Sequence, residues 1–212
     1  MSEVIIARDC RHGKLRVIAG DITQYEAQIS VTPANSRLGG REGLDSKIHD
    51  AAGEELRQAC IEIGKIERAQ NLQPCPAGTA VTTPGFNLPC EHLIHVVGPD
   101  CRRPSQDEAR RELLAKAYNA MFEQVKAIGG VETMVAPPIS MGIFAYPHRE
   151  GARLTMQLIL GWLDAEEHPG IDDYVMLVSE DNYVKNLKTV YRESEDQFPG
   201  IDCTRQYRKR RF

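Results

Sequence analysis

Short apolar runs and stretches of helical spacing alternate along the chain, and this alternation is typical of a sheet covered by helices. Apolar runs bounded by turn residues predict strands. The predicted strands are Val4–Ala7, Leu15–Ala19, Ile29–Val31, Thr79–Thr83, His92–Val97, Thr133–Ala136 and Tyr174–Val178. We therefore expect an α/β fold.

The predicted helices lie between these strands. The clearest has Leu114, Tyr118, Met121, Phe122 and Val125 on one face and ends before Gly129. The others cover residues 45–52, 54–63, 148–163 and 184–191. A glycine at position 53 separates the first two, and a glycine at position 64 is expected to end the second.

Helical and strand periodicity fades after about residue 194. We therefore predict one domain over residues 1–194, which includes the first strand over residues 1–13. The remaining residues, 195–212, form a predicted flexible tail that finishes in the basic run Arg205–Phe212.

Composition and charge narrow the class of protein. The 212 residues are 42% hydrophobic and 26% charged, which is ordinary for a globular protein. The net charge of −4 disfavours broad capture of nucleic acid, so only the basic tail is a candidate contact for it. We find no membrane-length apolar run, no signal-peptide form and no C-x-x-C among the 6 cysteines. We expect a monomeric cytoplasmic protein with reduced thiols and no membrane contact.

A glycine-rich loop carries the most distinctive polar pattern. Asn35 precedes the run Gly39–Gly43, and Asp45 stands in the first turn of the helix that follows. Glycines let a backbone approach a ligand and present its N–H groups, and a helix N-terminus favours an anion. The loop lacks the Gly-Lys-Ser/Thr of a Walker loop and a complete G-x-G-x-x-G, which disfavours a nucleotide triphosphatase or a dehydrogenase.

Three segments that follow predicted strands are expected to meet at one edge of the sheet. They are Gly20-Asp21, the loop 32–43 and the loop Ile139–Pro147. Ligands of open α/β sheets lie beyond the carboxyl ends of the strands. The sequence therefore predicts a crevice for a phosphorylated small molecule, bounded by these segments.

Six motifs in order resemble the macrodomain family, over residues 14 to 191. They are Gly20–Thr23, Pro33–Asp45, Cys75–Ala80 with Thr83–Pro89, His92–Pro99, Pro138–Phe144 and Ser179–Tyr183. The resemblance implies a three-layer α/β/α sandwich with a mixed central sheet and helices on both faces. It also implies binding of ADP-ribose.

The branch that the chain resembles most is that of the MacroD-like hydrolases, which remove single ADP-ribose units from acidic side chains of proteins without a metal or cofactor. The resemblance implies two catalytic residues: Asn35, which would hold the distal ribose, and Asp45, which would orient or activate the attacking water. Asp21 would accept a hydrogen bond from the adenine amino group. The implied ligand-binding residues are Asp21, Ile22, Gly40, Arg41, Glu42, Gly43, Leu44, Ser140, Met141, Gly142, Ile143 and Phe144.

Four positions depart from the family pattern. Thr32 stands where an asparagine is usual, Arg41-Glu42 interrupts the glycine run, Met141 replaces a small hydroxyl residue and Phe144 replaces a common tyrosine. Side chains with a Cβ restrict φ and keep the backbone farther from a phosphate. Arg41 offers a partner for a phosphate, whereas Glu42 would repel a pyrophosphate or serve as a second carboxylate.

Simpler roles stay open for the same residues. Asp45 suits a helix N-cap, Asn35 a turn and Asp21 an Asx turn, while His49 and His95 suit a buried core. At the level of function, the alternatives are an ADP-ribose reader without turnover and a deacetylase of O-acetyl-ADP-ribose. A third idea is a module that uses its basic tail to act on ADP-ribosylated nucleic acid.

Overall fold

The computed structural model describes residues 4–69, 72–102, 107–167, 170–179, 181–193 and 201–202. The strands are β1 (Val4–Asp9), β2 (Lys14–Ala19), β3 (Ile29–Pro33), β4 (Thr79–Pro84), β5 (His92–Val97), β6 (Thr133–Ala136), β7 (Asp173–Val178) and β8 (Ile201–Asp202). The helices are α1 (Gly43–Ala52), α2 (Glu54–Ala69), α3 (Asp107–Ile128), α4 (His148–Leu163) and α5 (Asp181–Glu193), with a 3-10 turn η1 (Ile22–Gln24). Each strand and helix predicted from the sequence overlaps an observed element.

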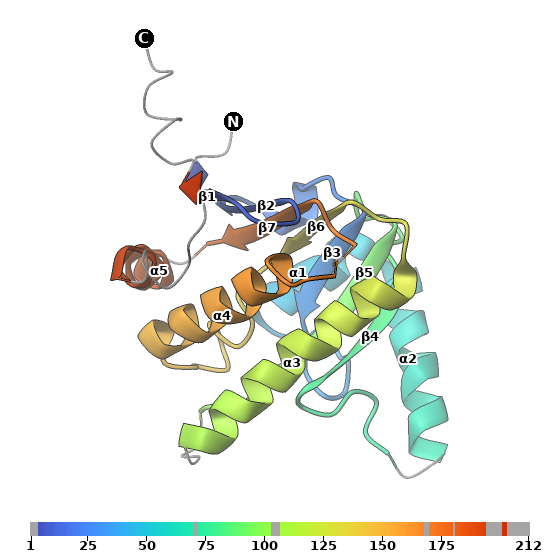
Figure 1. Cartoon of the computed structure of the whole chain (residues 1–212). Coiled ribbons are helices and arrows are strands. Elements are labelled where there is room, and N and C mark those ends of the chain that lie inside the picture. Colours follow the sequence, from blue (N-terminus) through green and yellow to red (C-terminus); the bar gives the residue numbers. More distant parts are fainter. Residues whose placement is uncertain are drawn as a thin grey trace.

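The strands form one mixed sheet in the order β4-β5-β3-β6-β7-β2-β1-β8 (Figure 1). The five central strands, from β5 to β2, pair parallel to their neighbours. Strands β4 and β1 add antiparallel pairs on the two sides. The mixed sheet expected from the sequence is confirmed.

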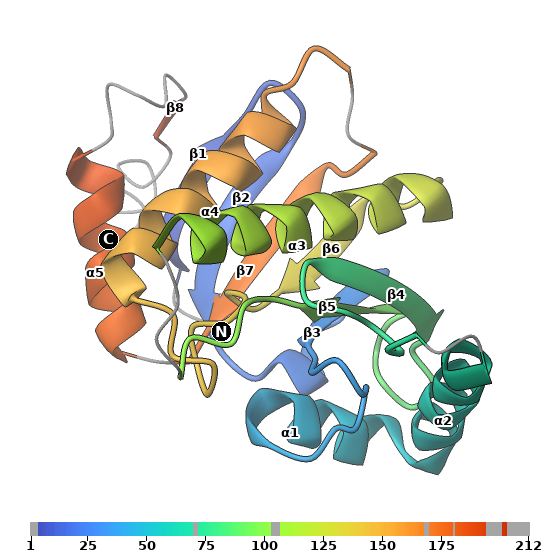
Figure 2. The same ribbon diagram turned by 90° about the horizontal axis from the view of Figure 1, so that it is seen from below.

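Helices cover both faces of the sheet (Figure 2). Helices α1 and α2 lie on one face, whereas α3 and α4 lie on the other with α5 beside α4. This is the expected three-layer α/β/α sandwich.

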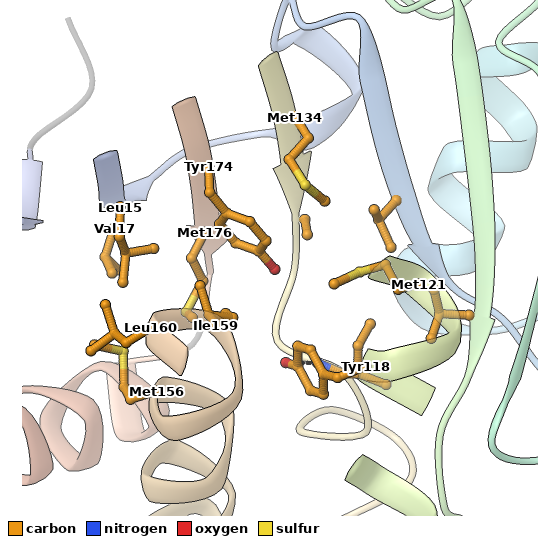
Figure 3. Close-up of a cluster of buried hydrophobic side chains, with 14 of the residues drawn as sticks. Leu15, Val17, Tyr118, Met121, Met134, Met156, Ile159, Leu160, Tyr174 and Met176 are labelled. Atoms are coloured by element: carbon orange, nitrogen blue, oxygen red, sulfur yellow. Dashed lines mark hydrogen bonds between the residues drawn. The ribbon is translucent and has the colours of Figure 1, made fainter. Parts of the chain in front are cut away.

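The residues of β7 show why the strands of this chain are continuous apolar runs in the sequence. Tyr174 and Met176 pack in the layer of α3 and α4, and Val175 and Leu177 pack in the layer of α1 and α2. Successive side chains of a strand point to opposite faces, so a strand that is covered on both sides is apolar at every position. Figure 3 shows the first of these layers, where Tyr174 and Met176 lie close to Ile159 of α4.

The parallel strands β5, β3 and β6 are neighbours, and this order places three loops together. The chain leaves β3 after Pro33, β5 after Val97 and β6 after Ala136. Because parallel strands end at the same edge of a sheet, the segments 34–42, 98–102 and 137–147 share that edge. The segment after β2 leaves the sheet farther along the same edge.

The predicted end of the second helix is wrong. Helix α2 continues through Gly64 and runs to Ala69. A glycine inside a helix costs only about 1 kcal/mol relative to alanine. The residues beyond Gly64 favour a helix, and the Glu62–Lys65 ion pair supports its next turn.

The C-terminal segment is described only in part. Ile201–Asp202 form a two-residue strand that pairs antiparallel with β1, where Arg8 faces Asp202. The rest of the predicted tail, including the basic run 205–212, lies outside the described residues. The domain boundary at residue 194 stays a prediction.

Two further observations concern the described part of the chain. Within it, no helix is both long and apolar enough to cross a bilayer. Its cysteines are free thiols: Cys10, Cys60, Cys75, Cys90 and Cys101.

Candidate functional site

A cavity of about 850 Å³ lies beyond the carboxyl ends of β3, β5 and β6. Its wall is drawn from the segments 33–45, 96–102 and 139–144 and from the facing sides of α1 and α2. Pockets for small ligands and cofactors have volumes of about 300 to 1,000 Å³. The cavity is therefore of a size to hold one such ligand.

Most of the site residues predicted from the sequence lie in this wall. Asn35 and Asp45 are both there, from the two ends of the glycine-rich loop. The predicted ligand-binding residues that line the cavity are Arg41, Glu42, Gly43, Leu44, Ser140, Gly142, Ile143 and Phe144. The structure thus brings two loops, about 100 positions apart in the sequence, into one cavity.

Asp45 lines the cavity as a nearly buried carboxylate. Its side chain is only 4% exposed. Oδ1 accepts a hydrogen bond of 2.7 Å from the Thr32 hydroxyl and lies 3.7 Å from Nε2 of His49. Oδ2 has no hydrogen-bond partner among the described residues. The carboxylate is held by one oxygen and has hydrogen-bonding capacity left on the other.

The surroundings of Asp45 shift its acidity. Burial raises the pKa of the Asp45 carboxyl above its usual value. The Thr32 hydroxyl, the His49 ring and the backbone N–H of Gly40 oppose this shift because they favour the ionised form. A perturbed carboxyl in a cavity wall is a candidate functional group.

Asn35 shapes the loop in which it stands. Its Oδ1 accepts from the backbone N–H of Arg37 at 3.0 Å and from that of Gly39 at 3.5 Å. A short carboxamide that bonds to the backbone two residues ahead is a common way to hold a turn. Asn35 therefore has the turn role left open by the sequence and also lies in the cavity wall.

The N-terminus of α1 faces the cavity through Gly43, Leu44 and Asp45. Glu42 occupies the N-cap position and makes no capping hydrogen bond with its side chain. Asp45, which the sequence left open as an N-cap, instead stands inside the first turn. The first N–H groups of a helix need partners, and an anion is the partner that the helix dipole favours.

The two loops touch each other beside the cavity. Gly43 has φ +62°, and a Cβ there would lie 2.7 Å from Cδ1 of Ile143. On the second loop Ser140 also has a positive φ, of 65°. Its Oγ is buried without a hydrogen-bond partner among the described residues, and it lies only 2.2 Å from where a Cβ of Gly98 would be. This close packing fixes the relative position of the two loops.

Arg102 connects the same loops at their exposed side. Its guanidinium forms two hydrogen bonds with the Asp100 carboxylate, at 2.9 and 2.6 Å. It also lies 4.0 Å from the Glu42 carboxylate and 5.5 Å from the centroid of the Phe144 ring. Arg102 thus contacts one residue of each loop that departs from the family pattern.

Four predicted residues lie outside the cavity wall. Asp21 caps η1, since its Oδ1 accepts from the N–H and the hydroxyl of Thr23 at 3.0 and 2.8 Å. This is the Asx-turn arrangement, and Ile22 beside it is 2% exposed. Met141 is 2% exposed, while Gly40 packs against the His49 ring. The ligand contacts expected of these four stay predictions.

The two histidines lie in the buried layer behind Asp45. His49 and His95 are each 1% exposed or less, as expected for core residues, and their ring centroids are 6.0 Å apart. Burial lowers the pKa of His95 to about 3. Nε2 of His95 is 3.0 Å from the Thr83 hydroxyl. The His95 ring is thus a neutral part of the core at ordinary pH.

The donor atoms of His49, Cys60 and His95 lie within 4.8 Å of one another, a separation that a metal ion would allow. Burial raises the pKa of the Cys60 thiol to about 12. A metal ion would therefore have to displace a firmly held proton in a buried site. We assign no metal here, and metal-independent chemistry stays a prediction from the sequence.

Several wall residues were missed by sequence reasoning. The main ones are Arg57 and Cys60 of α2 and Asp100 and Arg102 after β5. The rule that ligands lie beyond strand ends, applied to β5 as well, would have found the pair after Val97. The α2 residues had no such signal, because only tertiary packing turns that helix toward the cavity.

The comparisons with known proteins agree with this geometry. An O-acetyl-ADP-ribose deacetylase of Cronobacter turicensis is 34% identical over 172 residues, which are 81% of this chain and 95% of that protein. The human ADP-ribose glycohydrolase MACROD2 is 31% identical over 189 residues, 89% of this chain and 41% of that protein.

A solved structure, the Oceanobacillus iheyensis macrodomain with ADP, superposes with a TM-score of 0.80 at 29% identity, covering 93% of this chain and 98% of the other. The family model named Macro domain matches residues 31–155 of this chain, from β3 to α4. The matched region contains the whole glycine-rich loop, the cavity wall, helices α1, α2 and α3 and the first half of α4. The chain therefore belongs to the macro domain family.

Proposed function

We propose that the cavity binds ADP-ribose and that the protein hydrolyses an ADP-ribose derivative, releasing single ADP-ribose units from acidic side chains of modified proteins. One observation carries the proposal: Asn35, Asp45 and the uncapped N-terminus of α1 line the same cavity. The related proteins named as an O-acetyl-ADP-ribose deacetylase and an ADP-ribose glycohydrolase support it.

The diphosphate would lie between the two loops. Its negative charge suits the N-terminus of α1, and the arginines of the wall add positive charge. These arginines are Arg37, Arg41, Arg57 and Arg102. The wall also carries the carboxylates of Glu42, Asp45 and Asp100. Because these negative charges offset most of the positive charge, an anion is attracted only close to the arginines and the helix N-terminus.

The distal ribose would then lie near Asn35 and Asp45. Water would add its oxygen to the anomeric carbon, and the bond from that carbon to the carboxyl oxygen of the modified side chain would break. The products would be ADP-ribose with a new anomeric hydroxyl, a free carboxylate and the proton that the attacking water gives up. A carboxylate is a good leaving group, so the reaction needs no strong general acid. One residue that orients the water and one that holds the sugar are then sufficient for catalysis.

The burial of Asp45 sets a condition on this reaction. Because the carboxylate is 4% exposed, an attacking water has to be enclosed with the substrate rather than arrive from bulk solvent at the moment of reaction. An enclosed carboxylate acts in a low dielectric, where its effect on a developing positive charge on the sugar is larger than in water.

The experiment measures turnover and binding side by side. Wild type, Asp45→Ala and Asn35→Ala are incubated with an auto-modified ADP-ribosyltransferase that carries single units on acidic side chains, and separately with O-acetyl-ADP-ribose. Calorimetry with free ADP-ribose measures binding. We expect wild-type turnover, and we expect Asp45→Ala to lose at least about 100-fold in rate while it still binds. The two substrates separate protein de-modification from deacetylation.

A reader without turnover is the second candidate. It is favoured by the two bulky residues, Arg41 and Glu42, in the glycine loop and by Phe144, which stands where a tyrosine is common. Heat from ADP-ribose binding, with both substrates left intact by wild type, would establish the reader and exclude the hydrolase. Absence of both heat and turnover would exclude both.

A further inference from the structure

A hydrogen bond between Thr32 and Asp45, here called the clasp, joins the two ends of the glycine-rich loop. Thr32 lies on β3 and Asp45 in the first turn of α1, and between them the chain makes the whole loop that lines the cavity. The Thr32 hydroxyl donates to Oδ1 of Asp45 at 2.7 Å, which is a short hydrogen bond between buried groups. Thr32 is 0% exposed and Asp45 is 4% exposed, so solvent does not compete for the bond.

The clasp makes the two carboxylate oxygens unequal. Oδ1 receives the Thr32 proton and is also the oxygen that faces His49, at 3.7 Å from Nε2. Oδ2 has no partner among the described residues. The hydrogen bond through Oδ1 favours this orientation of the carboxylate, in which the lone pairs of Oδ2 have no partner among the described residues.

We propose that Thr32 is a positioning residue of the reaction: its hydroxyl keeps Asp45 ionised and turns Oδ2 toward the reacting water. This inference rests on the proposed hydrolysis and names a part of it that the family resemblance does not, since the family usually has an asparagine at this position. Thr32 itself touches neither the sugar nor the water.

The electrostatics agree with this role. Burial raises the pKa of Asp45, and the hydrogen bond from Thr32 is the largest influence that lowers it. The other titratable groups around the carboxyl are His49 of α1, Cys60 of α2 and, behind His49, His95 of β5. Burial keeps the pKa of each histidine below its usual value and that of the thiol above. Among the groups that favour the ionised carboxyl, the Thr32 hydroxyl thus has the largest effect, ahead of the His49 ring and the backbone N–H of Gly40.

The test replaces the hydroxyl and keeps the shape. Thr32→Val removes the donor at nearly equal volume, and Thr32→Ser restores the donor. Thr155→Val is a matched control: Thr155 is also 0% exposed, and its hydroxyl bonds to Tyr118 in the opposite core layer. For each protein, the rate of release of ADP-ribose is measured from pH 5 to 9, together with ADP-ribose affinity and stability to urea.

Loss of one hydrogen bond to a charge corresponds to about one pKa unit, so the acid limb of the Thr32→Val rate profile should move up by about one pH unit. We expect a rate about tenfold lower than wild type on that limb, an ADP-ribose affinity within about twofold, and recovery in Thr32→Ser. Thr155→Val should show the wild-type profile. A folded Thr32→Val protein with an unshifted profile would overturn the proposal.

A second measurement is independent of turnover. The carboxyl carbon of Asp45 is titrated by nuclear magnetic resonance in protein labelled with ¹³C-aspartate, and Asp45→Asn identifies the signal. The signal should titrate at a higher pH in Thr32→Val than in wild type and return in Thr32→Ser. If wild type has no turnover, the proposed function fails, while this titration still decides whether Thr32 supports the charge; equal titration in all three proteins would refute that role.

Discussion

The ring of His49 packs directly on the backbone of Gly40. A Cβ at Gly40 would lie 2.2 Å from Cγ of His49, and Gly40 has φ +54°. The glycine therefore meets two demands at once: a left-handed backbone conformation and a close approach by a buried ring. This contact ties the middle of the glycine-rich loop to α1.

The first prediction concerns this contact. Gly40→Ala adds a strained φ and a clash with His49, and we expect it to lower the free energy of unfolding by about 2–5 kcal/mol. Gly130 is a matched control, because it has φ +66° with no atom within 4 Å of a Cβ. Gly130→Ala should cost only about 1–2 kcal/mol. Urea unfolding of both variants measures the difference, and equal losses would contradict the packing argument.

The second prediction concerns the charge of Asp45. Its pKa in the folded protein is raised above the usual value of 3.8, so the folded state binds this proton more tightly than the unfolded chain. The contribution of Asp45 to the stability of wild type is therefore present below about pH 4 and is lost as the pH rises through the raised pKa of the folded state. Asn at this position keeps an acceptor for Thr32 but has no charge to bury.

We therefore expect Asp45→Asn to gain stability relative to wild type as the pH rises. The free energies of unfolding of both proteins are measured in urea at pH 5 and pH 8, and activity is measured alongside. The difference, variant minus wild type, should be larger at pH 8 while activity is lost. If the stability difference between variant and wild type stays constant or shrinks as the pH rises, burial of the charged Asp45 carboxylate does not destabilise the folded protein.

The third prediction concerns His95. Its pKa is lowered from 6.5 to about 3 by complete burial, so below pH 6.5 the unfolded chain takes up a proton that the folded protein does not. Stability is then lost as the pH falls, by about 1.4 kcal/mol between pH 7.5 and 5.5 for this one group. His95→Gln should remove that part of the slope. Urea titrations at the two pH values test this, and an equal slope in both proteins would refute it.

The fourth prediction concerns Arg102, which lies near Glu42 and the Phe144 ring. Arg102→Ala removes a positive charge from the cavity wall and a contact that supports Phe144, and we expect ADP-ribose to bind about three- to tenfold more weakly. The loss should shrink at high salt. Arg111→Ala is the control, since Arg111 is equally exposed at 50% and pairs with Glu150 outside the cavity wall. Calorimetry of both variants at low and high salt makes the comparison, and an equal effect of both would contradict a local role for Arg102.

The family and the two loops that carry the predicted wall residues could be predicted because local patterns carry them. Gly39–Gly43 with Asn35 before it and Asp45 after it form one continuous segment, and continuous segments leave a signature in the sequence. The end of α2 was misjudged because packing outweighs the weak helix preference of Gly64. Arg102 was missed because its significance depends on Glu42 and Phe144, which lie far from it along the chain.

The sequence by itself determined the order of strands and helices, the fold class and the family, because hydrophobic periodicity and short motifs are properties of neighbouring residues. Only the tertiary structure decided how the candidate groups are held. It buried Asp45, paired it with Thr32, packed Gly40 on His49 and left Asp21 in a turn outside the cavity wall. The physical reason is that burial and hydrogen-bond partners, which set the charge and direction of a side chain, come from segments that the folded sheet brings together.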